Sequence, residues 1–272
     1  MTNNSIPITH FDLSSIAANE RYALWKESIS VIFQTALPEK TPIDAFNAQL
    51  TTCHLSSVLL SATTSRQQYF NRPAQLIAQD GLDHFLVQLY TRGSTSGQWG
   101  KHNNSTVRTG DILFLDATRP ISSLTDDFSN LTLVVPRHLL TALHPNIEHQ
   151  HGAVLAREST FGKLLGAHML ALQDAALTMS AEEACAVGQG VVNVAALYFN
   201  HSLPKDACPA MQAATYKTIR DYILKNLAHP HLSPETIAAH FKMSRAYLYR
   251  LFDATEGVTH FIQEQRLLRA FT

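Results

Sequence analysis

The chain contains 272 residues with a mass of 30.1 kDa, which suits one large domain or two ordinary ones. Hydrophobic residues make up 45% of the sequence and charged residues 16%, so the chain can bury enough apolar surface to fold, and wholesale disorder is excluded. The richest apolar stretch, 187–199, is interrupted by glycines and polar residues, so the sequence predicts no transmembrane helix.

The N-terminal residues and the cysteines indicate the cellular compartment. The opening MTNNSIPITHFD lacks the basic lead and the apolar core of a secretory signal. Cys53, Cys185 and Cys208 lie far apart without a C-x-x-C pair, which argues against a disulfide framework and against a zinc knuckle. We therefore expect a cytoplasmic protein with reduced thiols and no membrane contact.

The distribution of charge is more informative than its total. Lys and Arg number 21 and Asp and Glu 22, which gives a net charge of −1. Residues 211–272 carry eight basic and five acidic side chains, a net +3, and the rest of the chain is acidic. This separation predicts an acidic body and a smaller basic C-terminal module, although +3 is also compatible with an ordinary solvated surface.

The N-terminal third begins with a helical pattern. Trp25, Ile29 and Phe33 recur at helical spacing after Asn19, a residue type that caps helices, and predict an amphipathic helix that ends before Pro38. From residue 43 to residue 136, apolar residues recur at every second position instead of at helical spacing.

Alternating apolar and polar residues mark half-buried strands in this segment. Phe85, Val87 and Leu89 give one example, and turn signals such as Asp80-Gly81 separate the strands. The run ILFL, residues 112–115, predicts a strand buried on both faces. Many short strands favour a small antiparallel barrel or sandwich over a parallel α/β sheet.

Helical spacing returns after Pro136. Two helices are predicted within 159–199, the second capped by Ser180 with Glu183 as its capping-box partner. Their apolar faces can pack on the barrel or on a second copy of the chain. For the second case we predict partner-facing positions at Leu165, Leu172 and Val192. The following stretch, 201–210, contains two prolines and no periodicity, and we interpret it as an interdomain linker.

The stretch SPETIAAHFKMSRAYLYRLFDATEG, residues 233–257, predicts two short helices joined by a turn. Ser233 and Pro234 form a strong helix start, and Ser244 can cap the second helix. Converging apolar faces make this pattern typical of a helix-turn-helix, and an ordinary αα-corner is the alternative.

A helical wheel separates the roles of the second helix. Leu248 points toward the predicted core, whereas Ala246, Tyr249 and Arg250 lie on the opposite side, where they can read base edges in a major groove. Ser244 and Arg245 lie at the helix N-terminus, where they can meet phosphate.

The segment MSRAYLYRLFDATEGVTHFIQEQRLLRA, residues 243–270, resembles the first helix-turn-helix and the linker helix of AraC/XylS-type transcription regulators. The motifs TGDILFLDATRP and VVPRHLL are similar to the cupin-like N-terminal sensor domains of one branch of that family. The resemblance implies that Ala246, Tyr249 and Arg250 face DNA. It also implies that a set of apolar residues holds the module together: Ile237, Leu248, Leu251 and Phe252.

Two features depart from the family pattern. Lys242 stands where the family usually has Gly in the turn between the helices. Such regulators also carry a second helix-turn-helix after the RLxRA helix, and this chain stops at Thr272. We therefore expect a regulator truncated within its DNA-binding region, which forfeits roughly 2–5 kcal/mol of specific binding.

Fourteen histidines raise the possibility of a metal site, and four of them lie within 138–151: His138, His144, His149 and His151. His149 and His151 could supply two ligands, but no carboxylate accompanies them at fixed spacing, and His54 and His84 on the predicted strands are isolated, without the H-x-H…E arrangement of metal-binding cupins. We interpret them as polar loop residues and expect no metal and no cofactor. The sequence also lacks hydrolase, dehydrogenase and NTPase motifs, so we predict that the chain is not an enzyme; a cupin-type metalloenzyme is the distant alternative.

The predictions combine into an α+β protein. Residues 1–200 form an effector-sensing and dimerisation domain with a cupin-like antiparallel β-barrel at 43–136, and 211–272 form an all-α helix-turn-helix segment. A small barrel encloses one small ligand, and our candidate lining residues are Tyr90, Arg92 and Trp99. The predicted function is a homodimeric transcription regulator that binds an unidentified effector and promoter DNA. The alternative is a small-molecule-binding regulatory module that does not bind DNA specifically by itself.

Overall fold

The computed structural model describes residues 5–39, 41–99, 102–144, 147–201, 209–227, 229, 231–241, 243, 245–252 and 257–270. The chain divides into two compact units, Met1–Ser202 and Leu203–Thr272, each with a hydrophobic core of its own. Most of the segment that we interpret as a linker, residues 202–208, lies outside the described residues.

The larger unit is built on two antiparallel sheets. One contains, in spatial order, β1 (Ile8–Asp12), β3 (Ala48–Leu55), β4 (Val58–Ser65), β11 (Phe128–Pro136), β6 (His84–Arg92), β9 (Ile112–Asp116) and β12 (Val154–Leu155). The other contains β2 (Gln34–Ala36), β5 (Gln68–Arg72), β10 (Ile121–Thr125), β7 (Ser94–Trp99) and β8 (His102–Arg108). The predicted antiparallel architecture is confirmed, and it extends beyond 43–136 because β1, β2 and β12 also join the sheets.

The central strands β6 and β9 of the larger sheet are buried on both faces, and successive side chains of each strand point to opposite sides. In β6, Phe85 and Val87 belong to the core shared with the helices, whereas Leu86 and Tyr90 belong to the core between the two sheets. Every residue of β9 is buried, which confirms the prediction for the run at 112–115.

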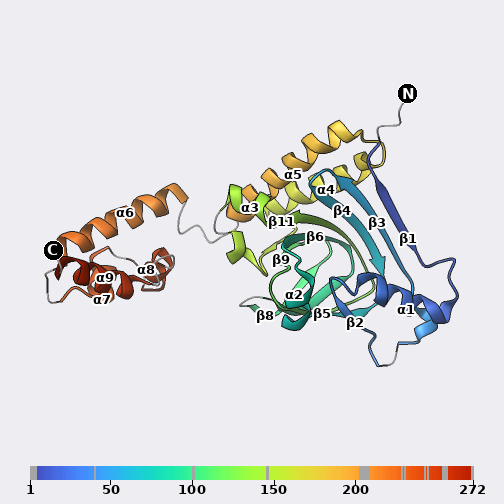
Figure 1. Ribbon diagram of the computed structural model, residues 1–272, viewed down its shortest axis with the longest axis horizontal. Coiled ribbons are helices and arrows are strands. Elements are labelled where there is room, and N and C mark those ends of the chain that lie inside the picture. Colours follow the sequence, from blue (N-terminus) through green and yellow to red (C-terminus); the bar gives the residue numbers. More distant parts are fainter. Residues whose placement is uncertain are drawn as a thin grey trace. The chain divides into compact units, whose positions relative to one another are not determined.

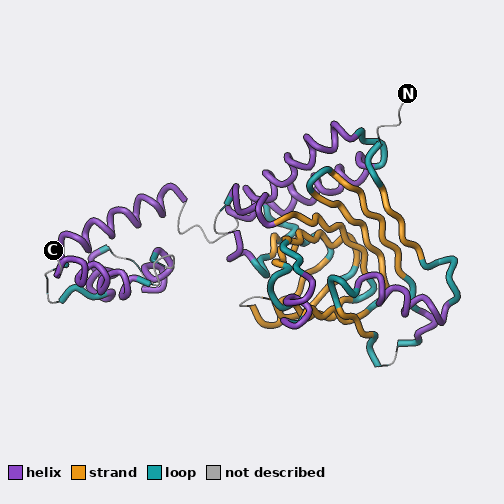
Figure 2. The backbone as a smooth tube through the Cα atoms, in the orientation of Figure 1, coloured by secondary structure: helices purple, strands orange, loops and turns teal. Residues whose placement is uncertain are grey.

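Five α-helices of this unit are described: α1 (Ala18–Ile29), α2 (Ala74–Asp80), α3 (Arg137–Leu143), α4 (Thr160–Ala176) and α5 (Ala181–His201). Figure 1 shows α4 and α5 side by side along one face of the larger sheet, and Figure 2 shows the same layering of helices on strands. The predicted capping box precedes α5: the Ser180 backbone N–H donates to Glu183 Oε2 at 2.9 Å, and the Glu183 N–H donates to Ser180 Oγ at 3.3 Å. None of the described helices is long and apolar enough to cross a lipid bilayer.

The three residues predicted to face a partner lie in the core of the protomer. Leu165 is 0%, Leu172 4% and Val192 1% exposed, and all three belong to the cluster that packs α4 and α5 on the larger sheet. The prediction was therefore wrong about the direction of these side chains. They pack on the larger sheet, which removes their apolar surface from water without a second copy of the chain.

The smaller unit contains four described helices, α6 (Pro209–Asn226), α7 (Pro234–His240), α8 (Arg245–Leu251) and α9 (Val258–Ala270), which Figure 1 shows gathered together. Ser233 caps α7, and Pro234 occupies its first turn, as predicted, although Thr236 completes the capping box. Ile237, Leu248 and Phe252 are fully buried in the core of this unit, as predicted, whereas the fourth predicted residue, Leu251, is partly buried and packs against that core.

Candidate functional site: a neutral cavity and an exposed helix face

A cavity of about 150 Å³ lies between the two sheets of the larger unit. Alternate residues of β4, β6 and β11 form one wall, strands of the smaller sheet form the opposite wall, and the end of α1 with the residues that follow it contributes Ile29, Ile32 and Phe33. An engineered cavity of similar volume, lined by apolar residues, binds benzene. The space is therefore large enough for one small organic molecule.

Aromatic side chains form a connected part of the lining. The rings of Phe33 and Phe70 meet edge to face at a centroid distance of 5.6 Å, and those of Phe70 and Phe128 at 5.8 Å. Tyr90 continues the series at 6.3 Å from Phe128. These ring pairs have the tilted and edge-to-face geometries that aromatic groups prefer, so the wall is a rigid, flat-sided surface.

Neutral polar groups gather at one end of the cavity. Thr95 and Thr125 share a hydrogen bond of 2.8 Å between their hydroxyls, and both contact the Tyr90 hydroxyl, as does Asn130. Burial raises the pKa of Tyr90 to about 12, and these hydrogen bonds only partly oppose that effect. The Tyr90 hydroxyl therefore keeps its proton and remains uncharged at neutral pH.

Two buried polar atoms of lining residues have no hydrogen-bond partner: Asn130 Oδ1 and Trp99 Nε1. Asn130 is 6% exposed and Trp99 2% exposed. Buried polar groups are satisfied in the great majority of cases, so an unsatisfied acceptor in a cavity wall is a position where a bound molecule can contribute the missing hydrogen bond. Among the described residues that line the cavity, none carries a charge.

The structure places two of the three predicted lining residues, Tyr90 and Trp99, in the cavity wall. Arg92 is exposed at the end of β6 and borders a separate depression together with Arg66 and Asp127. That part of the prediction was wrong. Asn130 was missed, and the available signal was a polar residue within the otherwise apolar strand FSNLTLVVP.

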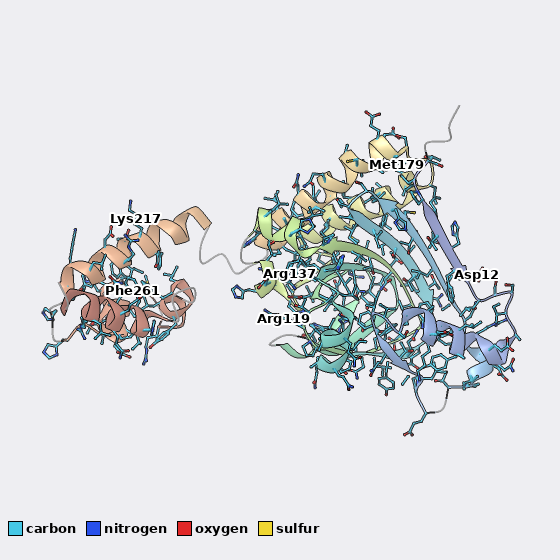
Figure 3. The ribbon with its side chains drawn as sticks, viewed as in Figure 1. Asp12, Arg119, Arg137, Met179, Lys217 and Phe261 are labelled. Carbon is cyan, nitrogen blue, oxygen red and sulfur yellow. The ribbon has the colours of Figure 1, made fainter. Side chains whose placement is uncertain are left out.

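An ionic cluster centred on the buried Asp116 lies in the same unit near α3. The Arg137 guanidinium pairs with Asp116 at 2.5 Å, with Glu148 at 2.9 Å and with Asp83, and it lies 4.5 Å from the ring centre of Phe85. Figure 3 shows Arg137 close to Arg119, the second arginine that pairs with Asp116. Since each acid has an arginine partner, this cluster ties β6, β9 and α3 together and has a structural role.

His151 lies beside this cluster. Its Nδ1 accepts the backbone N–H of Asp116 at 2.9 Å, and burial lowers the pKa of His151 to about 4. This histidine is only 5% exposed, so it is a core residue and not the polar loop residue that we expected. Within the described ranges, no three His, Cys, Asp or Glu side chains gather as metal ligands do.

The second candidate site is the outer face of α8. Leu248 is 0% exposed, whereas its neighbour Tyr249 is 38% exposed and places its hydroxyl 3.3 Å from Thr259 Oγ1. Arg245 is exposed and pairs with Glu235 at 2.8 Å. Ser244 lies outside the described residues; Ala246 and Arg250 belong to the α8 backbone, but their side chains are not described.

Comparison with known proteins gives the family. Residues 33–197, which contain most of the sheets and the cavity, match the AraC-binding-like domain. The chain belongs to this family. The AraC-binding-like domain thus accounts for more than half of the chain, and the C-terminal unit follows it.

Two solved structures and one curated relative are similar to this member of the family. The AraC-like transcriptional activator CuxR matches with a TM-score of 0.68 and 20% identity over 98% of this chain and 96% of that one, and therefore has the same fold. Apo ToxT from Vibrio cholerae strain SCE256 matches with a TM-score of 0.34 and 12% identity over 79% of this chain and 82% of that one. An uncharacterized protein in a nit 5′ region of Bacillus sp. strain OxB-1 is 24% identical over 128 residues, 47% of this chain. The chain spans about half, 49%, of the length of that relative.

Proposed function

We propose that this protein is a transcription regulator that binds a small effector in the cavity between its sheets and binds promoter DNA through a helix-turn-helix formed by α7 and α8. The observation that carries the proposal is the cavity between the sheets of an AraC-binding-like domain, on the same chain as a helical unit with an exposed face. The description of CuxR as an AraC-like transcriptional activator supports the regulatory class.

The geometry of the smaller unit supports α8 as the recognition helix. Leu248 fixes its inner side in the core, so the side that carries Tyr249 is free to enter a groove. Ser244 and Arg245, at the start of the helix, are proposed to contact phosphates, and Ala246, Tyr249 and Arg250 to contact base edges.

A mobility shift with DNA from the region upstream of the protein's own gene tests this proposal. We expect binding that weakens as salt is added, since phosphate contacts release counterions, and that weakens further in Arg250→Ala. The matched control is Arg157→Ala, because Arg157 is an exposed arginine of the larger unit. Absence of salt-dependent binding by the folded chain would instead support the alternative, a small-molecule-binding module that does not bind DNA itself.

We also propose that the regulator is a homodimer. With the predicted residues buried in the core, exposed leucines on the same two helices are the better candidates for the contact: Leu164 is 50% exposed on α4, and Leu197 is 51% exposed on α5. Light scattering of the native chain and of Leu164→Lys/Leu197→Lys measures the oligomeric state. A native monomer at micromolar concentration contradicts this part of the proposal.

A further inference from the structure

We propose that the cavity selects an uncharged aromatic compound that carries a hydrogen-bond donor, of the aryl alcohol class. This inference rests on the proposed function, because it assigns a ligand class to the cavity taken there as the effector site. Three properties of the wall lead to it: its lack of charge, its aromatic shape, and the separation of its polar and apolar ends.

The lack of charge excludes carboxylates and ammonium ions. No described lining residue is ionised, and transfer of an unpaired charge into such surroundings is strongly unfavourable. Arg72 is buried but is not one of the lining residues; its Nη2 has no hydrogen-bond partner, and its charge is paired with Asp80 at 2.6 Å, while the Ile32 carbonyl accepts from it at 2.8 Å. It therefore offers no charge for an acidic ligand.

The size and the aromatic lining favour a ring. The volume of about 150 Å³ is that of a cavity that holds benzene. The series of rings from Phe33 through Phe70 and Phe128 to Tyr90 gives the wall flat faces and edges, which a bound ring can meet in stacked or edge-to-face geometry.

The strand register orders the polar groups into rows across the larger sheet. One row joins Thr63, Asn130 and Tyr90, and the next joins Ser61, Thr132 and Gln88. These six residues all line the cavity.

The third row is apolar. It contains Val134, Leu86 and Leu115, which also line the cavity. The wall formed by the larger sheet therefore changes from two mainly polar rows, which Leu50 and Leu113 extend, to an apolar row, and the Trp99 indole N–H is a further unpartnered donor of the lining. A ligand that matches it has one polar end and an apolar body.

The polar end lacks a donor for one specific atom. Thr95, Thr125 and the Asn130 side chain already hydrogen bond with Tyr90, and the Gln88 amide donates to the Thr132 hydroxyl at 3.4 Å. Asn130 Oδ1 is buried and has no partner. It can only accept, so the ligand group that satisfies it must donate, as the hydroxyl of an aryl alcohol does.

Intrinsic fluorescence reports on this site directly, because both tryptophans of the chain, Trp25 and Trp99, line the cavity. We would titrate the full chain at pH 7 with benzyl alcohol, benzyl methyl ether, toluene and benzoate, and confirm binding by calorimetry. We expect benzyl alcohol to bind about tenfold more tightly than its methyl ether, which cannot donate, and roughly 100-fold or more above benzoate.

The variant Asn130→Leu keeps the number of side-chain heavy atoms but removes the acceptor, together with the amide group that contacts Tyr90, and Asn193→Leu on the exposed side of α5 is the matched control. We expect the first to abolish the preference of benzyl alcohol over the ether and the second to keep it. The probe series on the native chain decides the question even where Asn130→Leu does not fold.

Two results would overturn the inference, and they differ in what they leave standing. Benzoate or the ether binding as tightly as benzyl alcohol contradicts the ligand class but leaves the cavity as an effector site. No response to any of the four probes by the folded chain contradicts the ligand class and counts against the effector site as well, whereas DNA binding is measured independently.

Discussion

The Arg72 guanidinium and the Asp80 carboxylate form an ion pair of 2.6 Å, with side chains that are 0% and 5% exposed. Arg72 also donates to the carbonyls of Ala117, at 2.6 Å, and Ile32, at 2.8 Å. One side chain thus joins β5, the end of α2, the turn after β9 and the segment after α1. Because Ile32 lines the cavity, this buried pair fixes part of its wall.

Replacing only one residue of this ion pair is expected to lower the free energy of unfolding more than replacing both. Arg72→Leu leaves the buried Asp80 carboxylate without its ionic partner, with only the Leu82 backbone N–H donating to it, and we expect a loss of about 3–5 kcal/mol in the free energy of unfolding. Arg72→Leu/Asp80→Leu leaves no unpaired charge and should lose clearly less. Urea unfolding followed by circular dichroism measures both. If the single and the double variant lose the same free energy of unfolding, the unpaired Asp80 carboxylate is not the cause of the loss.

His151 makes the stability of the larger unit depend on pH. Burial holds the pKa of His151 at about 4, below the value of about 6.5 expected in the unfolded chain. The unfolded state therefore binds more protons between these values, so the stabilisation is complete above pH 6.5 and is lost as the pH falls toward 4. We expect the unfolding free energy to decrease by about 1–2 kcal/mol from pH 7 to pH 5 through this group.

The variant His151→Asn isolates that contribution. An asparagine can still accept the Asp116 backbone N–H but does not titrate, so the decrease between pH 7 and pH 5 should become smaller by the amount that His151 supplies. Urea titrations of both proteins at the two pH values give the comparison. Parallel pH dependences in native and variant chains would contradict the role of His151.

Two glycines with positive φ provide a matched test of packing against Trp99. Gly152 has φ +84° and Gly81 φ +64°, so alanine is strained at both. An added Cβ at Gly152 would lie 2.7 Å from Trp99 Cδ1 and 2.9 Å from its carbonyl oxygen, whereas at Gly81 nothing lies within 4 Å.

We expect Gly81→Ala to cost about 1–2 kcal/mol from the backbone alone. Gly152→Ala should cost more, because Trp99 must also move, and it should shift the tryptophan emission. Thermal unfolding followed by fluorescence measures both effects. Equal costs with an unchanged emission spectrum would mean that Trp99 is not held by this contact.

Local patterns predicted much of the fold. The alternation in β6 and the apolar run in β9 indicate burial directly, since alternate side chains of a strand point to opposite faces of the sheet. The capping residues Ser180 and Ser233 lie where α5 and α7 begin. The direction of Leu165 was not predictable in this way, because an apolar helix face has the same pattern whether a sheet or a second chain covers it.

The candidate site depended more on tertiary context. Tyr90 and Trp99 were identified by residue type, but Asn130 matters because the register of β11 places it beside Tyr90 and leaves Oδ1 without a partner. The same applies to Arg72 and Asp80, since they are eight positions apart and meet only once β5 and α2 are folded. Neither relationship has a signature in the local sequence.

The proposed DNA-binding face gives the last prediction. Arg245 pairs with Glu235 at 2.8 Å, but their side chains are 60% and 54% exposed, so this pair contributes little to stability and Arg245 is free to turn toward a phosphate. We expect Arg245→Gln to weaken binding to all DNA sequences alike and to reduce the slope of log K against log salt by about 0.9. Glu235→Gln, which frees Arg245 and removes a negative charge, should strengthen binding instead. Filter-binding titrations at several salt concentrations measure these slopes, and an unchanged slope in Arg245→Gln would exclude a phosphate contact at this position.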